Sequence, residues 1–116
     1  MDIVFKTSKL EKNCNNYQAA VRAWGEPMAR KLVQRLNEFR AADTLSVISH
    51  LPPPRLHKLD GRRGDEYAVD LVHPARLIFR IHQEPIPLCL DGGVDRSKVT
   101  SIMIVEVEDY HGKQKR

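Results

Sequence analysis

The sequence predicts an α+β domain, because the two halves of the chain carry different apolar periodicities. Up to residue 42, apolar residues recur at three- and four-residue spacing, which is typical of amphipathic helices. After residue 54 they alternate with polar residues, which is typical of half-buried strands. Because 116 residues suit one compact domain, we expect a single domain over residues 1–116, with helices packed on an antiparallel sheet.

Composition and charge are those of an ordinary globular protein with a mild basic excess. Hydrophobic residues make up 41% of the chain and charged residues 29%. The formal net charge is +4, and the excess lies in residues 1–58, which hold ten Lys and Arg against five Asp and Glu. This balance is compatible with nucleic acid or with an acidic partner protein.

Several classes of protein are excluded. No apolar run approaches the roughly 18 residues of a membrane span, and the N-terminal residues lack the apolar core of a signal peptide. We therefore expect a cytoplasmic protein that does not bind a membrane. Cys14 and Cys89 match no zinc-ligand spacing, so we expect inert thiols and neither a metal nor a cofactor.

The first part of the chain predicts a short strand and then two helices. Ile3–Phe5 is the candidate strand, and Thr7 or Ser8 is the candidate N-cap of the first helix. Asparagines among residues 13–16 interrupt its apolar stripe and predict a break or bend. Pro27 suits the first turn of the second helix, where its missing N–H costs nothing.

The second helix has one apolar and one polar face. The apolar face consists of Met28, Leu32, Leu36 and Phe39. The residues expected to face solvent are Arg30, Lys31, Gln34, Arg35 and Glu38. We expect this helix to end near Ala42 and Pro52–Pro54 to form an extended connector to the sheet.

The remaining residues predict the strands of an antiparallel meander. The expected strands are 55–59, 67–72, 76–82 and 99–107. The last of them is apolar on both faces, which predicts an inner position in the sheet. Residues 85–97 are expected to form a long excursion before it.

Several side chains with catalytic potential lie on or beside these strands. Arg76 and Arg80 are expected on one strand face, roughly 13 Å apart. Each of these residues, considered alone, is explained more simply as a solvent-exposed or packed side chain than as a catalytic one. Taken together they supply a base for a 2′-hydroxyl, an acid for a leaving 5′-oxygen and cations for charge on phosphorus. The set is His57, Lys58, Arg76, Arg80, Asp109, Tyr110 and His111.

Three ordered segments resemble the HigB-type killer toxins of the RelE/ParE superfamily. The first has the pattern His-x-Leu-x-Gly from His57, the second is Pro-x-Arg-Leu-Ile-Phe from Pro74, and the third is Glu-Asp-Tyr-His, ending at His111. The helical stretch that ends at Asp43 is also similar, so the resemblance covers nearly the whole chain.

The resemblance implies a ribosome-dependent mRNA endoribonuclease that cleaves codons in the decoding site. It implies a RelE-like fold, with two N-terminal helices packed on a curved antiparallel sheet. It also implies inhibition by a HigA-like helix-turn-helix antitoxin. The toxin would contact operator DNA only through this antitoxin.

The resemblance also assigns roles to residues. It implies acid/base or orienting roles for His57 and His111, and phosphate binding for Arg76 and Arg80. Asp109 would orient the site and Tyr110 would stack on a base. Many family members carry Lys where Asp60 stands, and the nearby cations that can replace it as RNA-binding residues are Lys58, Arg62 and Arg63.

Two other functions remain open at this point. One is a ParE-like inhibitor that binds DNA gyrase without cleaving RNA, and the other is a degenerate toxin retained as a co-repressor with its antitoxin. The acid/base set argues against the first, whereas Asp60 leaves the second open. A helix-turn-helix reading frame beside the gene is expected for a toxin.

Overall fold

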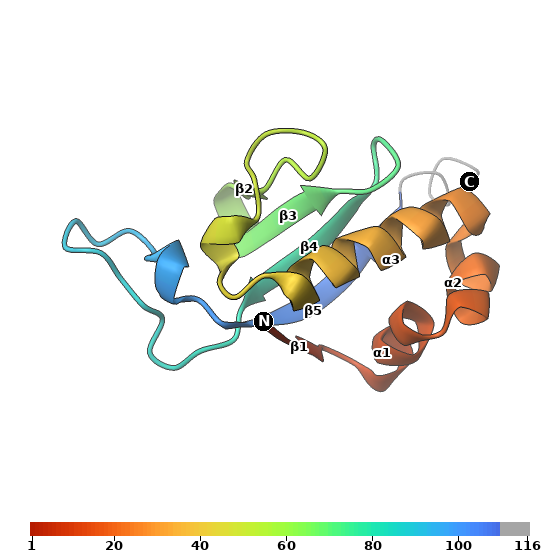
Figure 1. Ribbon diagram of the computed structural model, residues 1–116, viewed down its shortest axis with the longest axis horizontal. Helices are drawn as coiled ribbons and strands as arrows, with labels where there is room; N and C mark the ends of the chain where they lie inside the picture. Colours follow the sequence, from red (N-terminus) through yellow and green to blue (C-terminus); the bar gives the residue numbers. More distant parts are fainter. Residues whose placement is uncertain (110–116) are drawn as a thin grey trace.

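The computed structural model describes residues 1–109. Within this range the chain forms three helices and a five-stranded sheet, so the predicted α+β fold is confirmed (Figure 1). The helices are α1 (Ser8–Asn15), α2 (Tyr17–Trp24) and α3 (Glu26–Ala41). The strands are β1 (Asp2–Phe5), β2 (His57–Lys58), β3 (Glu66–Asp70), β4 (Arg76–Ile81) and β5 (Ser101–Glu108).

The break predicted among the asparagines is present and divides the expected first helix, so the expectation of two N-terminal helices is wrong. Asn16 ends α1 by donating its backbone N–H to the Lys12 carbonyl at 3.1 Å. The Asn16 side chain then caps α2 by accepting from the Ala19 N–H at 3.0 Å. Thr7, rather than Ser8, caps α1, because its hydroxyl oxygen accepts from the Leu10 N–H.

The sheet has the strand order β1-β5-β4-β3-β2. β2 to β5 form the expected antiparallel meander, and β5 has a neighbour on each side, as its apolar composition predicts. β1 pairs with β5 in parallel, so the expectation of a wholly antiparallel sheet is wrong at this edge. The three helices and the strands β2 to β4 all lie between β1 and β5 in the chain, and this long connection allows the two strands to pair in parallel.

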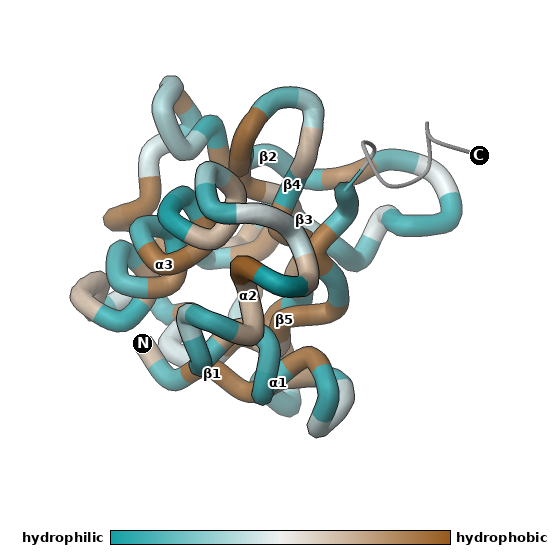
Figure 2. The backbone as a smooth tube through the Cα atoms, turned by 90° about the vertical axis from the view of Figure 1, so that its right-hand side faces the viewer, coloured by the Kyte–Doolittle hydropathy of each residue, from teal (hydrophilic) through white to brown (hydrophobic). Residues whose placement is uncertain are grey.

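α3 packs on one face of the sheet and forms the main core there. The ring of Phe39 meets the ring of Phe79 edge-on, with 5.0 Å between their centroids. Figure 2 shows apolar segments in both α3 and β5. The other sheet face, which we call the open face, has a small buried cluster that contains no helix residue among residues 1–109; it consists of Leu59, Ala68 and Ile78.

Arg35, which the helical pattern places in solvent, is only 2% exposed. Its guanidinium donates to the carbonyls of Asp70 at 2.7 Å and Pro53 at 2.8 Å, and pairs with Glu38 at 3.1 Å. The connector is therefore pinned to α3 and is not extended. It turns back, and the Arg55 N–H donates to the Leu51 carbonyl at 3.1 Å.

Several strands are shorter or shifted relative to the sequence prediction, and β3, for example, covers residues 66–70 instead of 67–72. β2 comprises two residues, because Arg55 adopts a positive φ of 50° and its guanidinium binds the Asp70 carboxylate at 2.7 and 2.9 Å. β5 begins at Ser101 rather than at residue 99. The predicted excursion is present between β4 and β5 and projects at the left of Figure 1. No described helix is both long and apolar enough to cross a membrane.

Replacement of Arg35 by Met is expected to lower the free energy of unfolding by about 3 kcal/mol, because two buried carbonyls and Glu38 lose their donor. Arg30→Met, on the exposed side of the same helix, should leave the free energy of unfolding nearly unchanged. Urea denaturation of the two variants measures the difference. Equal effects would contradict the anchoring role of Arg35.

The two thiols are expected to differ in reactivity. Burial raises the pKa of the Cys14 thiol to about 12, although Arg40 opposes this shift, whereas Cys89 is exposed. At pH 8 Cys14 therefore stays protonated and unreactive. Mass-spectrometric mapping after iodoacetamide treatment should find Cys89 alkylated in the folded protein and Cys14 alkylated only in denaturant. Equal labelling of both in the folded state would show that Cys14 is not buried.

Candidate functional site

Arg76 and Arg80 lie on the open face of the sheet, as the alternation along β4 predicts. In the register, Arg76 pairs with Asp70 on one side and Glu108 on the other, and Arg80 pairs with Glu66 and Met103. Directly paired residues share a sheet face, so this face carries both charge signs.

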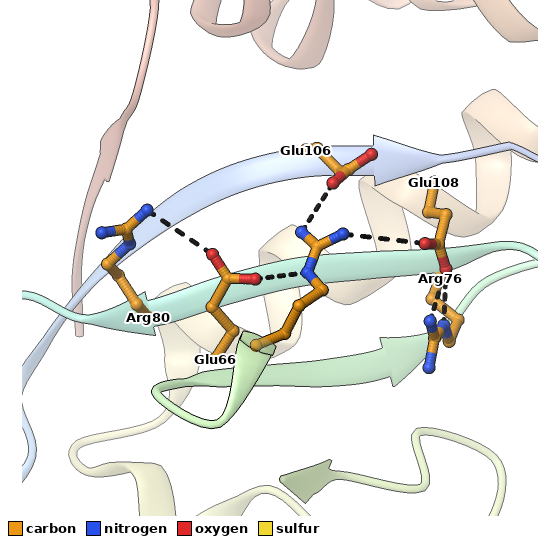
Figure 3. Close-up of polar contacts among 6 residues, drawn as sticks. Glu66, Arg76, Arg80, Glu106 and Glu108 are labelled. Carbon is orange, nitrogen blue, oxygen red and sulfur yellow. Dashed lines mark hydrogen bonds and ion pairs between the residues drawn. The ribbon is translucent and has the colours of Figure 1, made fainter. Parts of the chain in front are cut away.

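The arginines are engaged with carboxylates (Figure 3). Arg76 binds Glu108 with an N–O distance of 2.6 Å, and Arg80 reaches Glu66 at 3.5 Å. Arg63, from the short turn Gly61–Arg63, joins these pairs into one network. Its guanidinium lies 2.5 Å from Glu66, 2.6 Å from Glu106 and 3.8 Å from Glu108. We call this cluster the arginine–glutamate network; it comprises Arg63, Glu66, Arg76, Arg80, Glu106 and Glu108.

The sequence analysis missed Glu106 and Glu108 because an irregularity in β5 reverses the alternation, and it missed Glu66 because the expected strand began one residue later, at residue 67. Strict alternation from Ile102 and Ile104, which face the helices, would put Glu106 on the same side. A register shift follows Ile78, which pairs with Glu106, while the next residue of β4 pairs with Ile104. Val105 is thus an extra residue, as in a β-bulge, and Glu106 reaches the open face. The available signal was the presence of two glutamates in an otherwise apolar strand.

The arginine–glutamate network has no net charge, because it contains three guanidiniums and three carboxylates. Hydrogen bonds from Glu66 and then Glu106 raise the pKa of the Arg63 guanidinium further above its already high value, so it remains cationic. A phosphate that binds these arginines therefore competes with the carboxylates for their donors. Among residues 1–109, no three His, Cys, Asp or Glu side chains gather into a group that could hold a metal ion.

Arg80 also reaches a groove at the end of the sheet. Its Nε is buried and is the only such side-chain nitrogen or oxygen in the described part of the chain that lacks a hydrogen-bond partner. The groove has a volume of about 610 Å³ and is lined partly by Tyr67 and by Ile86 and Leu88 of the excursion. Arg80 therefore lines this groove and keeps one buried donor without a partner.

His57 lies on the open face, whereas Lys58 does not. In the register His57 pairs with Ala68, which belongs to the open-face cluster, and Lys58 pairs with Tyr67, which belongs to the main core. His57 Nδ1 lies 2.8 Å from the Arg55 carbonyl oxygen. A carbonyl only accepts, so Nδ1 carries a proton and Nε2 is the basic nitrogen of the neutral ring.

The structure describes some of the remaining predicted site residues and not others. Asp109 follows β5 directly, one residue after Glu108, and is half-buried. Tyr110 and His111 lie outside the described residues, so their roles stay predictions. Arg62 and Asp60 are exposed beside the turn that carries Arg63. The structure thus gathers His57, Arg76, Arg80 and Arg63 on one face, whereas Lys58 faces the other side and lines the groove that Arg80 also borders.

Comparison with solved structures identifies the fold. The chain is similar to the YoeB/ParE toxin from Agrobacterium tumefaciens, with a TM-score of 0.53 and 11% identity over 93% of this chain and 96% of that chain. It is similar to the YoeB–YefM complex from Staphylococcus aureus, with a TM-score of 0.53 and 14% identity over 94% of this chain and 95% of that chain. The chain has the fold of the YoeB/ParE toxins. No protein-family model matches it, and a comparison with curated proteins finds no match.

Both YoeB/ParE similarities extend over more than nine-tenths of the chain, so they include the helices as well as the sheet. The resemblance to the RelE/ParE superfamily inferred from the sequence agrees with this toxin fold. At identities of 11% and 14%, the likeness concerns the backbone arrangement and not the side chains of the site.

Replacement of Arg63 by Met is expected to lower the free energy of unfolding by about 2 kcal/mol, because buried Glu66 loses its nearest partner. The matched control is Arg62→Met, which removes the same charge from the exposed neighbour and should cost less than about 0.5 kcal/mol. Thermal or urea unfolding tests both variants. A cost for the Arg62 variant as large as that for the Arg63 variant would show that the network does not hold this turn.

Proposed function

We propose that this chain is the toxin of a toxin–antitoxin module and acts as a metal-independent endoribonuclease that cleaves mRNA on the ribosome. One observation carries the proposal: three guanidiniums and an imidazole share the open face of a YoeB/ParE toxin fold. The Asp-Tyr-His segment begins where β5 ends, next to the Arg76–Glu108 pair. The segments around His57, Pro74 and His111 favour the HigB-type branch.

The proposed reaction needs no group from outside the chain and its RNA. His57 Nε2 takes the proton of a 2′-hydroxyl, and the 2′-oxygen attacks the adjacent phosphorus. His111 protonates the 5′-oxygen as its bond to phosphorus breaks, which leaves a 2′,3′-cyclic phosphate and a 5′-hydroxyl. Arg76 and Arg80 stabilise the additional charge on the phosphoryl oxygens during attack.

The other residues of the proposed site position the RNA. Tyr110 stacks on a base and Asp109 orients the acid/base groups. Arg62 and Lys58 contact the RNA backbone outside the reacting phosphate, since one is exposed beside the network and the other lies at the groove. The ribosome supplies mRNA in a fixed conformation, which explains how a domain this small could select its substrate.

A partner antitoxin belongs to the same proposal. One of the similar structures is a complex of YoeB with YefM. We propose that this chain likewise binds an antitoxin, of the HigA-like helix-turn-helix type, and that it reaches operator DNA only through that partner.

One observation favours a second function, inhibition of DNA gyrase without RNA cleavage. The arginine–glutamate network is electrically balanced, so a binding surface could use it without any phosphate. The two functions differ in what happens in the cell, because gyrase inhibition breaks DNA and leaves mRNA intact.

Inducible expression in bacteria, with mapping of mRNA 5′ ends, is expected to show growth arrest and new ends within translated codons. Arg80→Ala and His111→Ala should lower cleavage by roughly 100-fold or more, because each removes a group that acts in the transition state. Arg22→Ala, at an exposed position of α2, is the matched control and should cleave normally. Circular dichroism verifies that each variant is folded.

Arrest without new mRNA ends would refute the endoribonuclease, and arrest with DNA breaks would establish the gyrase alternative. Full activity of Arg80→Ala would show that Arg80 is only a solvated strand residue.

A further inference from the structure

The carboxylate of Glu106 differs from the other two carboxylates of the arginine–glutamate network. The side chains of Glu66 and Glu108 are each 9% exposed, and each of them contacts two arginines. Glu106 is 38% exposed, and among residues 1–109 its one ion pair is with Arg63. Because exposed ion pairs contribute little free energy, Glu106 is the carboxylate that leaves the network at the lowest cost.

Arg63 remains in place when Glu106 leaves. Its Nε is held by Glu66 at 2.5 Å, and its Nη1 lies 3.8 Å from Glu108. Only Nη2 is directed to Glu106, at 2.6 Å. The departure of Glu106 therefore exposes a guanidinium nitrogen whose position is already fixed by two buried carboxylates.

Glu106 also has space into which it can turn. It borders a hollow of about 270 Å³ between β5 and the helices, which is lined in addition by Lys9 and Asn13. Lys9 provides a cation and Asn13 an amide on that side. The bulge in β5 that brings Glu106 to the open face thus sets it between Arg63 and this hollow.

From this geometry we infer that the Glu106 carboxylate occupies a binding position for a phosphodiester group, and that single-stranded RNA takes its place on Arg63. A guanidinium binds carboxylate and phosphate oxygens with the same planar donors, so one anion can substitute for the other. This inference rests on the proposed function. It adds that Glu106 keeps the binding position on Arg63 filled when no RNA is bound and yields it to a phosphodiester group.

RNA suits the site better than an acidic protein segment does, because Arg63 lies between two further arginines of the same face. Arg63 contacts Glu66 and Glu108, and these two glutamates in turn contact Arg80 and Arg76. The cations thus form a row along the sheet, as a backbone with regularly spaced phosphates requires.

The test measures binding of a fluorescent 2′-O-methyl RNA oligonucleotide, which cannot be cleaved, to the purified chain by anisotropy. Glu106→Gln removes the competing charge at nearly constant shape and should tighten binding roughly fivefold. The matched control is Asp91→Asn, which removes one negative charge from the exposed excursion and should change binding less than about twofold. In the Glu106→Gln background, Arg63→Gln should abolish the gain.

Tightening below about twofold, or equal tightening by Asp91→Asn, would overturn the inference. A glutamate-rich peptide of the same charge serves as the second ligand, and tightening for the peptide but not for the oligonucleotide would also overturn it. If Arg63→Gln fails to fold, the comparison of Glu106→Gln with Asp91→Asn decides alone. The binding assay uses neither ribosomes nor cleavage. The RNA-binding inference can therefore be confirmed even if the endoribonuclease proposal is refuted, and it can be refuted even if that proposal is confirmed.

Discussion

The pairing of Arg63 with Glu66 is the interaction on which the open face depends. The helices cover one side of the sheet, so the other side has to be closed by its own strand residues and by the turn over Gly61–Arg63. Glu66 is almost buried on β3, and a buried carboxylate without a partner would cost several kcal/mol. Arg63 satisfies it, and in doing so brings a guanidinium over the middle of the sheet.

This arrangement holds the side chains of the arginine–glutamate network in place through ion pairs. Each buried carboxylate is shared by two arginines, so the guanidiniums are held by charge-assisted hydrogen bonds on short, well-packed elements. Guanidiniums fixed in this way need little reorganisation when a phosphate arrives, which is the condition for electrostatic catalysis. The three carboxylates also offset the repulsion among the three guanidiniums of the open face. The exposed Glu106 is the carboxylate that can leave most easily.

The sequence predicts the parts of the fold that depend on local pattern. Alternation along β4 correctly separates Leu77 and Phe79, in the core, from Arg76 and Arg80, on the open face. The asparagines correctly predict the break between α1 and α2.

The parts that the sequence misses depend on contacts between distant segments. Arg35 lies on the polar side of a helical pattern, yet it is buried because the connector and β3 present carbonyls that need a donor. The irregularity that brings Glu106 to the open face depends on how β5 pairs with β4, and the parallel pairing of β1 joins the first strand of the chain to the last. Glu106 and Glu108 could therefore not be recognised as site residues before the register was known.

The central claim is that the open face of the sheet is the surface that binds mRNA. A cryo-electron microscopy structure of the chain on a ribosome carrying 2′-O-methyl mRNA would test it most directly. The account predicts that the chain binds in the decoding site, with Arg76 and Arg80 against mRNA phosphates and Arg63 released from Glu106. Binding through the helix-covered side, or no binding to the decoding site, would contradict it.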